Sequence, residues 1–251
     1  MRMYLLYYGV TNVDKGLVLT DGRDVGKIIP TPIWGTLLET PEGWILVDTG
    51  MHPDHLTDPN ATFRGTPLEG KIQPIMEPKD LASARVRSCG VEPEHIRYVI
   101  NTHLHFDHCG GNRFFPQAEF IVQAEHFEWA MQSDQCHKRD FDLPGTRWRL
   151  VRGRTTVVPG VELIPTPGHV PGHQSVLVHL PQTGPVILTA DAITLYETVR
   201  PDAPVTAWDP VMYKQSAEML LRMQRELNAH LFVSHEQEVW DRWRHAPEFY
   251  C

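Results

Sequence analysis

The run Thr102–Gly111 constrains this chain more than any other part of the sequence. It follows the apolar stretch 98–100, which predicts a short buried strand. A single histidine is usually a satisfied surface or core residue, but four potential metal ligands within six positions favour a metal site, because imidazole and carboxylate together suit zinc and similar divalent ions. The four are His103, His105, Asp107 and His108.

If this run is extended, its alternate side chains leave the backbone on opposite sides. His103 and His105 would then face one metal, and Asp107 and His108 would face a second metal close by. Two metals roughly 3.5–4 Å apart can share a water and convert it to hydroxide near neutral pH. The spacing therefore predicts a hydrolytic centre with two metal ions.

Three further potential ligands each follow an apolar strand candidate, as His103 does: His169, Asp191 and His235. A single histidine at such a place is more often a packing residue, but strand ends that converge would bring all of these side chains to one rim. We expect one metal to be held by His103, His105 and His169. We expect the other to be held by Asp107, His108 and His235. Asp191 would bridge both, because a carboxylate has two oxygens.

Composition limits the class of protein. The chain has 251 residues, of which 41% are hydrophobic and 22% charged, as in soluble globular proteins. A net charge of -8 disfavours a nucleic-acid partner, and no apolar run approaches the ~20 residues that span a bilayer. The start resembles a first strand rather than a signal peptide, and four cysteines without a CxxC pair favour a reducing compartment. We expect one cytoplasmic domain over residues 1–251, without membrane contact.

Apolar runs separated by turn residues predict many short strands and few helices. Residues 32–39 and 44–48 are expected to form a hairpin, and 212–226 is the clearest amphipathic helix. Residues 51–77 are predicted to form a long loop that covers a site, and 133–150 a surface loop. This mixture indicates two sheets with helices outside them.

The motifs resemble those of the metallo-β-lactamase superfamily, in the expected order and over nearly the whole chain. The residues that carry this resemblance are the run His103–His108, Asp48-Thr49-Gly50, Thr166–His173, Asp191 and His235. Within the superfamily the chain is most similar to the N-acyl homoserine lactonases, which destroy bacterial quorum signals. The closer similarity lies in Leu37–Thr40, Ile45–Met51, Phe106, Gly110–Asn112 and Pro171–Ser175.

The resemblance implies an α+β fold of the αββα type, with two mixed sheets flanked by helices. It also implies two divalent metal ions, with Zn²⁺ favoured and Co²⁺, Mn²⁺ or Fe²⁺ as alternatives, and a small-molecule lactone as substrate. Asp48 and His173 would hold metal ligands through hydrogen bonds, although Asp48 could also be a turn cap. Asp107 would pass a proton to the departing ring oxygen. Whether the protein is a monomer or a homodimer stays open.

One position departs from the family pattern. These lactonases usually carry a tyrosine three residues after the bridging aspartate, where its hydroxyl meets the substrate carbonyl, and that position is Thr194 here. Tyr196 could take the same catalytic role, or it could be a packing residue. Four apolar residues are candidate contacts for an acyl chain: Trp34, Ile75, Met76 and Phe106.

Other activities of the same superfamily are weighed against this one. Hydrolysis of other lactones such as γ-butyrolactone stays open. A glyoxalase II-like thioesterase would place a helical domain after the core, whereas 16 residues follow His235. Secreted β-lactamases lack a bridging aspartate at Asp191, and iron-binding redox relatives carry a glutamate at the place of His105. The sequence therefore favours a lactonase.

Overall fold

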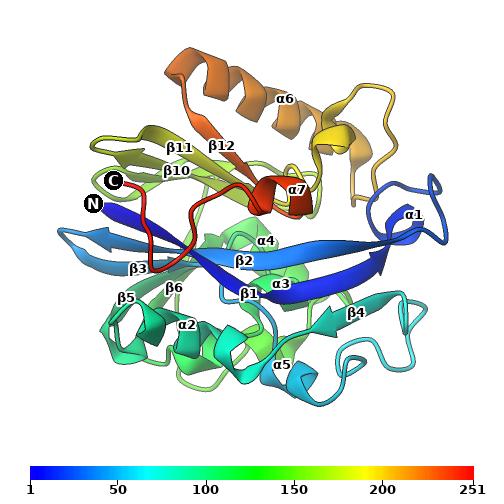
Figure 1. Cartoon of the computed structure of the whole chain (residues 1–251), viewed down its shortest axis with the longest axis horizontal. Helices are drawn as coiled ribbons and strands as arrows, with labels where there is room; N and C mark the ends of the chain where they lie inside the picture. The colour runs from blue at the N-terminus through cyan, green and yellow to red at the C-terminus, as the bar shows by residue number, and fades with distance from the viewer.

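The computed structural model describes residues 1–251 and contains two mixed β-sheets packed face to face, with helices on their outer sides (Figure 1). The first sheet has seven strands in the order β4-β1-β2-β3-β5-β6-β7. Their bounds are β1 (Arg2–Asp14), β2 (Ile28–Thr40), β3 (Gly43–Val47), β4 (Ile72–Ile75), β5 (Ile96–Ile100), β6 (Glu119–Gln123) and β7 (Arg147–Val151).

The second sheet has five strands in the order β12-β11-β10-β9-β8. Their bounds are β8 (Thr155–Val158), β9 (Val161–Pro165), β10 (Gln174–Leu180), β11 (Gly184–Ala190) and β12 (His230–Val233). Each sheet combines parallel and antiparallel pairs, because β3, β5, β6 and β7 run parallel in the first sheet and β11 and β12 in the second. The expected αββα architecture is confirmed.

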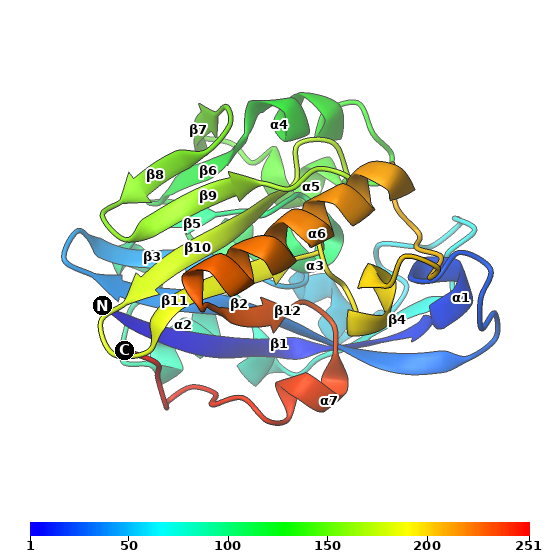
Figure 2. The same ribbon diagram turned by 90° about the horizontal axis from the view of Figure 1, so that it is seen from above.

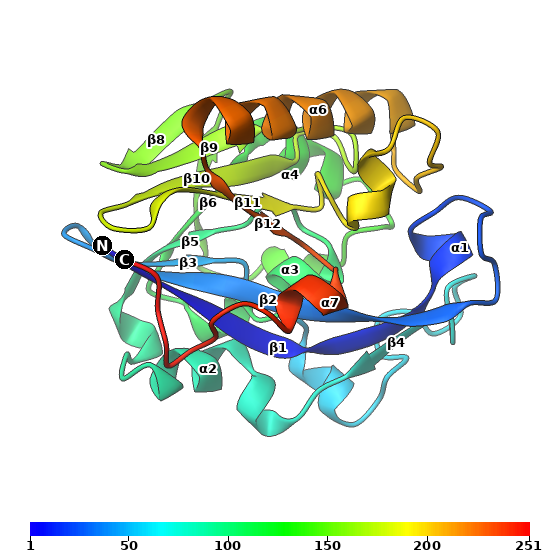
Figure 3. The same ribbon diagram turned by 45° about the horizontal axis from the view of Figure 1, so that its top comes forward.

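Helices cover the outer face of each sheet. Helix α6 (Pro210–Leu227) lies across β10 and β11 (Figure 2), and α2 (Ala82–Ser88) lies on the opposite side of the molecule, against β1 (Figure 3). The shorter helices are α1 (Lys15–Val18), α3 (Phe106–Cys109), α4 (Ala124–Ala130), α5 (Lys138–Phe141) and α7 (Gln237–Trp240). Five 3₁₀ turns complete the set: η1 (Pro53–Leu56), η2 (Pro78–Asp80), η3 (Pro93–His95), η4 (Asn112–Phe114) and η5 (Tyr196–Val199).

Alternation along the strands divides the core into layers. On β3, Ile45 points into the core between the two sheets, while Leu46 packs toward α2. On β10, Val176 and Val178 point into the same inner core, while Leu177 packs toward α6. Both faces of these strands are therefore buried, which explains why they consist of nearly unbroken apolar runs.

The strand directions place several chain segments at one edge of the molecule. Strands β3 and β5 are parallel in the first sheet, and β9, β11 and β12 share one direction in the second. The carboxyl ends of these five strands lie at the same edge, so the segments that follow the strands all begin there. Gln174 joins the two sheets there, because its side-chain amide donates to Asn101 O at 2.9 Å and its backbone N–H to Thr102 O at 3.1 Å.

Two expected loops contain regular structure. Residues 51–77 hold η1 and β4, which pairs with β1 at the edge of the sheet. Residues 133–150 hold α5 and most of β7, which pairs with β6. The prediction of a surface loop over 133–150 was wrong, because the sequence Arg-Trp-Arg-Leu-Val of β7 belongs to a largely exposed edge strand and lacks an apolar run.

The two ends of the chain lie side by side (Figures 1 and 2), where Met3 and Tyr250 form an antiparallel bridge. None of the helices combines the length and the apolar character that crossing a bilayer would require.

Asp140 on α5 is a buried carboxyl without a hydrogen bond. Its side chain is fully buried, and its nearest cationic group, Arg139 Nε, lies 3.7 Å away. Burial raises the pKa of Asp140 to about 7, although Arg139 and Arg113 act in the opposite direction. The folded protein therefore holds this proton at pH values where the unfolded chain has lost it. The contribution of Asp140 to the unfolding free energy is present below pH ~4 and is lost as the pH rises toward ~7.

We expect Asp140→Asn to remove this dependence. Relative to wild type, the variant should gain about 3–5 kcal/mol in unfolding free energy between pH 4 and pH 7.5. Urea unfolding of both proteins at a series of pH values measures the difference. Parallel pH profiles for the two proteins would contradict the assignment.

Candidate metal centre

Seven ligand-type side chains converge at the edge where the carboxyl ends of the strands meet. They form three overlapping groups in which all potential ligand atoms lie within 4.8 Å of one another. The groups are His103/His105/His169, His103/His108/Asp191 and Asp107/His108/His235. Every residue that the sequence analysis assigned to a metal is thus present in the cluster, and their roles as ligands stay predictions.

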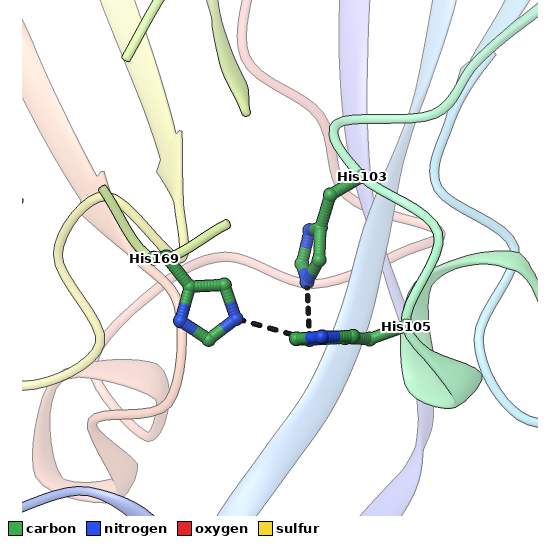
Figure 4. A group of neighbouring side chains, drawn as sticks. All are labelled: His103, His105 and His169. Atoms are coloured by element: carbon green, nitrogen blue, oxygen red, sulfur yellow. Dashed lines mark hydrogen bonds between the residues drawn. The ribbon is translucent and has the colours of Figure 1, made fainter. Parts of the chain in front are cut away.

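Three imidazoles make up the first group, and their ring nitrogens point toward one another (Figure 4). His103 Nε2 and His169 Nε2 each lie 3.0 Å from His105 Nδ1. Burial, together with the neighbouring imidazoles, holds the pKa values of His103 and His105 well below their ordinary range. These two rings are therefore neutral, which is the form that binds metal ions.

The carboxylate of Asp191 lies between the imidazole groups. Its Oδ2 is 3.4 Å from His169 Nε2, while its Oδ1 is 3.3 Å from both His108 Nε2 and His235 Nε2. Asp107 Oδ2 completes the second side, at 3.6 Å from His108 Nε2 and 3.8 Å from His235 Nε2. The two oxygens of one carboxylate thus face two different sets of imidazoles.

Opposite charges dominate the pKa shifts of Asp191 and His108. Burial alone would raise the pKa of Asp191, but the imidazoles of His235 and His108 outweigh it and hold that pKa well below its ordinary range. Burial alone would lower the pKa of His108, but nearby carboxylates raise it well above its ordinary value. Protons on His108 and His235 therefore balance the negative charge of the buried carboxylates. A divalent cation that bound here would compete with these protons.

Asp48, which follows β3, holds His108 from behind. Its Oδ2 accepts hydrogen bonds at 2.8 Å from His108 Nδ1 and from the Thr102 hydroxyl, and its Oδ1 accepts from the Thr102 backbone N–H at 2.8 Å. These bonds direct His108 Nε2 toward Asp191. Asp48 has a left-handed backbone (φ 57°), an uncommon conformation for a residue with a side chain, so the fold stores strain beside the cluster.

The second sheet supports the cluster from its own side. His173 Nε2 accepts a hydrogen bond from the Asp191 backbone N–H at 3.1 Å, and its Nδ1 donates to the Thr166 hydroxyl at 2.9 Å. His235 Nδ1 donates to Pro32 O on β2 at 3.1 Å, which fixes the opposite nitrogen toward the cluster. Asp48 and His173 thus each form a hydrogen bond to a residue of the cluster, and their role in holding metal ligands stays a prediction.

His126 on α4 is a supporting residue that sequence reasoning missed. Its Nε2 accepts from the Leu104 backbone N–H and its Nδ1 donates to Pro171 O, both at 2.8 Å. Burial lowers the pKa of His126 to about 4, so the ring stays neutral. It thereby ties the segment that carries His103 and His105 to the segment that follows His169. Sequence reasoning passed over it because it is the third residue of α4, just after β6, where an isolated histidine is usually a packing residue.

The conformation expected for the histidine run was wrong in part. His105 is extended, but α3 begins at Phe106, so Asp107 and His108 lie on one helical turn, and the backbone N–H groups of His108 and Cys109 donate to His105 O. The turn of this helix, rather than alternation along an extended chain, separates these residues from His103. A four-residue helix has too few residues for periodicity to be visible in the sequence.

The departure at Thr194 has a structural counterpart on α6. Thr194 is buried, and both its backbone N–H and its hydroxyl contact the hydroxyl of Tyr213, at 3.0 and 3.2 Å. Tyr213 is also fully buried, so neither hydroxyl is accessible from solvent. Tyr196 begins η5 and is 40% exposed, and its backbone N–H donates to Glu236 Oε2. Its catalytic role stays a prediction.

The four candidate acyl contacts lie in different surroundings. Phe106 packs edge-on against Phe63, at 4.8 Å between ring centroids, and Met76 belongs to the same buried cluster. Ile75 is 51% exposed at the end of β4. The indole of Trp34 donates to Ser234 O and packs against two tryptophans of the C-terminal segment, Trp240 and Trp243. Phe63 was missed because residues 51–77 show no periodicity.

The cluster fits a divalent metal centre. Each neutral imidazole carries one N–H, so three ring nitrogens that converge on each other cannot all be satisfied by mutual hydrogen bonds. His108 Nε2 is likewise buried without a hydrogen bond of good geometry. A bound cation would satisfy all of these atoms and compensate the carboxylates, and mixed imidazole and carboxylate ligands are those that zinc and related ions accept.

Comparisons with known proteins identify the family of this chain. The family model of the metallo-beta-lactamase superfamily matches residues 28–235. An N-acyl homoserine lactonase of Bacillus thuringiensis is 38% identical over 248 residues, which cover 99% of this chain and 98% of that protein. The N-acyl homoserine lactonase AttM of Rhizobium radiobacter is 30% identical over 264 residues, 100% of this chain and 99% of that protein.

Solved structures give the same result. An N-acyl homoserine lactone hydrolase with the product N-hexanoyl-L-homoserine at its catalytic metal centre matches with a TM-score of 0.93 and 35% identity, over 99% of this chain and 98% of that one. The chain therefore belongs to the metallo-β-lactamase superfamily. Within that superfamily it is a member of the N-acyl homoserine lactonase family, and its activity depends on metal.

Asp48→Asn should weaken metal binding by about 10–100-fold, because the amide cannot hold His108 as the carboxylate does. Competition with a chromophoric chelator measures the affinity. Asp14→Asn is the matched control, since Asp14 is a buried aspartate whose carboxylate accepts from the backbone N–H groups of Leu17 and Gly26 and forms no hydrogen bond with a cluster residue. Equal affinities for wild type and Asp48→Asn would contradict this role.

Proposed function

We propose that this protein opens the lactone ring of N-acyl homoserine lactones at a centre of two divalent cations, with zinc favoured and cobalt, manganese or iron(II) as substitutes. The observation that carries the proposal is the placement of Asp191, whose two oxygens face two different sets of imidazoles. His103, His105 and His169 would hold one cation. Asp107, His108 and His235 would hold the other. Identity over nearly the full length to lactonases adds the substrate class.

The reaction adds one water across the ring ester. When bound, the cations would supply a water of lowered pKa and polarise the carbonyl. The chain's own residues then orient the substrate and move the proton. The water oxygen bonds to the carbonyl carbon, the bond between that carbon and the ring oxygen breaks, and the ring oxygen takes a proton. The products are a carboxylate and a free hydroxyl on the same acyl homoserine.

Asp107 is the proposed proton carrier. Its carboxylate is 12% exposed, more than the Asp191 carboxylate at 6%, so it is the acidic side chain of the cluster that a substrate can reach more easily. Its position beside His108 and His235 would place it next to the departing ring oxygen. An acid at that place supplies the proton that the leaving alkoxide requires.

Tyr196 is the proposed donor to the substrate carbonyl. Thr194 and Tyr213 are buried and bonded to each other, whereas Tyr196 is partly exposed on the segment that follows Asp191. A phenol at this place would donate a hydrogen bond to the oxyanion that forms on attack. Phe106, Met76, Ile75 and Trp34 are the proposed apolar contacts of the acyl chain.

Removal of metal tests the proposal. We expect chelated protein to lose lactone hydrolysis and to recover it with zinc, cobalt or manganese. A rate comparison should favour N-acyl homoserine lactones over γ-butyrolactone by at least about tenfold in kcat/KM, because each buried CH₂ of the acyl chain contributes ~0.8 kcal/mol. The same comparison should show slower hydrolysis of thioesters. Full activity in metal-free protein would overturn the mechanism, and faster thioester hydrolysis would overturn the substrate class.

Tyr196→Phe should lower kcat about tenfold while KM changes little, because the lost hydrogen bond forms in the transition state. Steady-state kinetics on one acyl homoserine lactone measures both constants. Tyr98→Phe, at a half-buried tyrosine on β5, is the control and should match wild type. A wild-type kcat for Tyr196→Phe would make Tyr196 a packing residue.

A further inference from the structure

The hydroxyl of Ser234 lies against the carboxylate of Asp191. Ser234 directly follows β12 and precedes His235, and its Oγ donates to Asp191 Oδ1 at 2.7 Å. Both residues are 4% exposed. This is the only hydrogen bond of the Ser234 hydroxyl, so the proton on that oxygen has one acceptor within the protein.

The backbone of Ser234 is fixed on both sides. Its N–H donates to Ile193 O at 3.1 Å, on the segment that follows Asp191. Its carbonyl oxygen accepts the indole N–H of Trp34 on β2, which belongs to the other sheet. The hydroxyl is therefore held in place by the packing of the two sheets, and it can act as a fixed donor toward Asp191.

Only one of the two Asp191 oxygens receives this hydroxyl. Oδ1, which accepts from Ser234, is the oxygen that faces His108 and His235. Oδ2 faces His169 and accepts no hydroxyl. A carboxylate turns easily about its last side-chain bond, and a turned Asp191 could offer both oxygens to one cation. The fixed donor opposes that rotation.

We propose that Ser234 is a positioning residue that keeps Asp191 shared between two cation positions, by holding Oδ1 on the side of His108 and His235. This inference rests on the proposed function, because it assumes that Asp191 bridges. Serine acts here through Asp191 and does not touch the substrate. Its loss should therefore change how many cations are held, and how tightly, before it changes anything else.

Metal binding tests the inference directly. Metal-free wild type, Ser234→Ala and Ser234→Thr are titrated with Co²⁺, and visible absorption follows the binding steps. We expect wild type to bind two cobalt ions. In Ser234→Ala the second step should weaken about 10–100-fold, as is usual when the support of a metal ligand is removed, while the first step changes far less. Ser234→Thr keeps a hydroxyl and should bind both ions.

Ser83→Ala is the matched control. Ser83 is a buried serine on α2 whose hydroxyl makes no hydrogen bond, and its removal should leave both cobalt steps at their wild-type values. Thermal unfolding of the metal-free proteins shows whether each variant is folded before the titration. Because the number of cations is read from spectra, a general loss of stability cannot imitate the loss of one binding step.

Two results would overturn the inference without affecting the proposed function. The first is that Ser234→Ala binds both cobalt ions with the binding constants of wild type. The second is that Ser234→Thr binds the second cobalt ion as weakly as Ser234→Ala does. A wild-type protein that binds fewer than two ions would overturn the two-cation proposal itself, and the inference with it. That result appears in the wild-type titration alone.

Discussion

The buried charge of Asp191 is the interaction on which the rest of this site depends. A carboxylate in a water-excluded place is very costly unless cations or hydrogen-bond donors surround it. Asp191 has imidazoles from three different segments around it, a hydroxyl from Ser234 on Oδ1, and its backbone N–H bound to His173. The neighbours that stabilise this charge are the same residues that a metal centre requires.

The spacing of the cluster is set by the contact between two sheets. One sheet supplies His103, His105 and Asp48, and the other supplies His169, Asp191 and His235. Three sets of hydrogen bonds join the two sheets beside the cluster: those of Gln174, the bond from His235 to Pro32 O and the bond from Trp34 to Ser234 O. Because a close-packed interior yields little to local strain, the fit between the inner faces fixes the distances between the side chains.

The sequence alone was enough to predict the architecture and the seven members of the cluster. Strand ends can be recognised locally, and a ligand-type residue directly after an apolar run is visible without any knowledge of the fold. His126, Ser234 and Tyr213 could not be found in this way, because each acts through a contact with a residue remote in the sequence. The helical turn of α3 and the edge strand β7 were missed because both are too short or too polar to produce a periodic pattern.

The meeting of the chain ends has a practical consequence. Arg2 pairs with Glu39 on β2, and Glu39 in turn pairs with Trp44 near the start of β3. Asp48 follows the other end of β3, so the termini and the cluster lie at opposite ends of the sheet. A tether to a solid support at either end would leave the centre open to solution. A short linker between the ends would also allow new termini to be cut into a surface loop, which makes the chain suited to circular permutation.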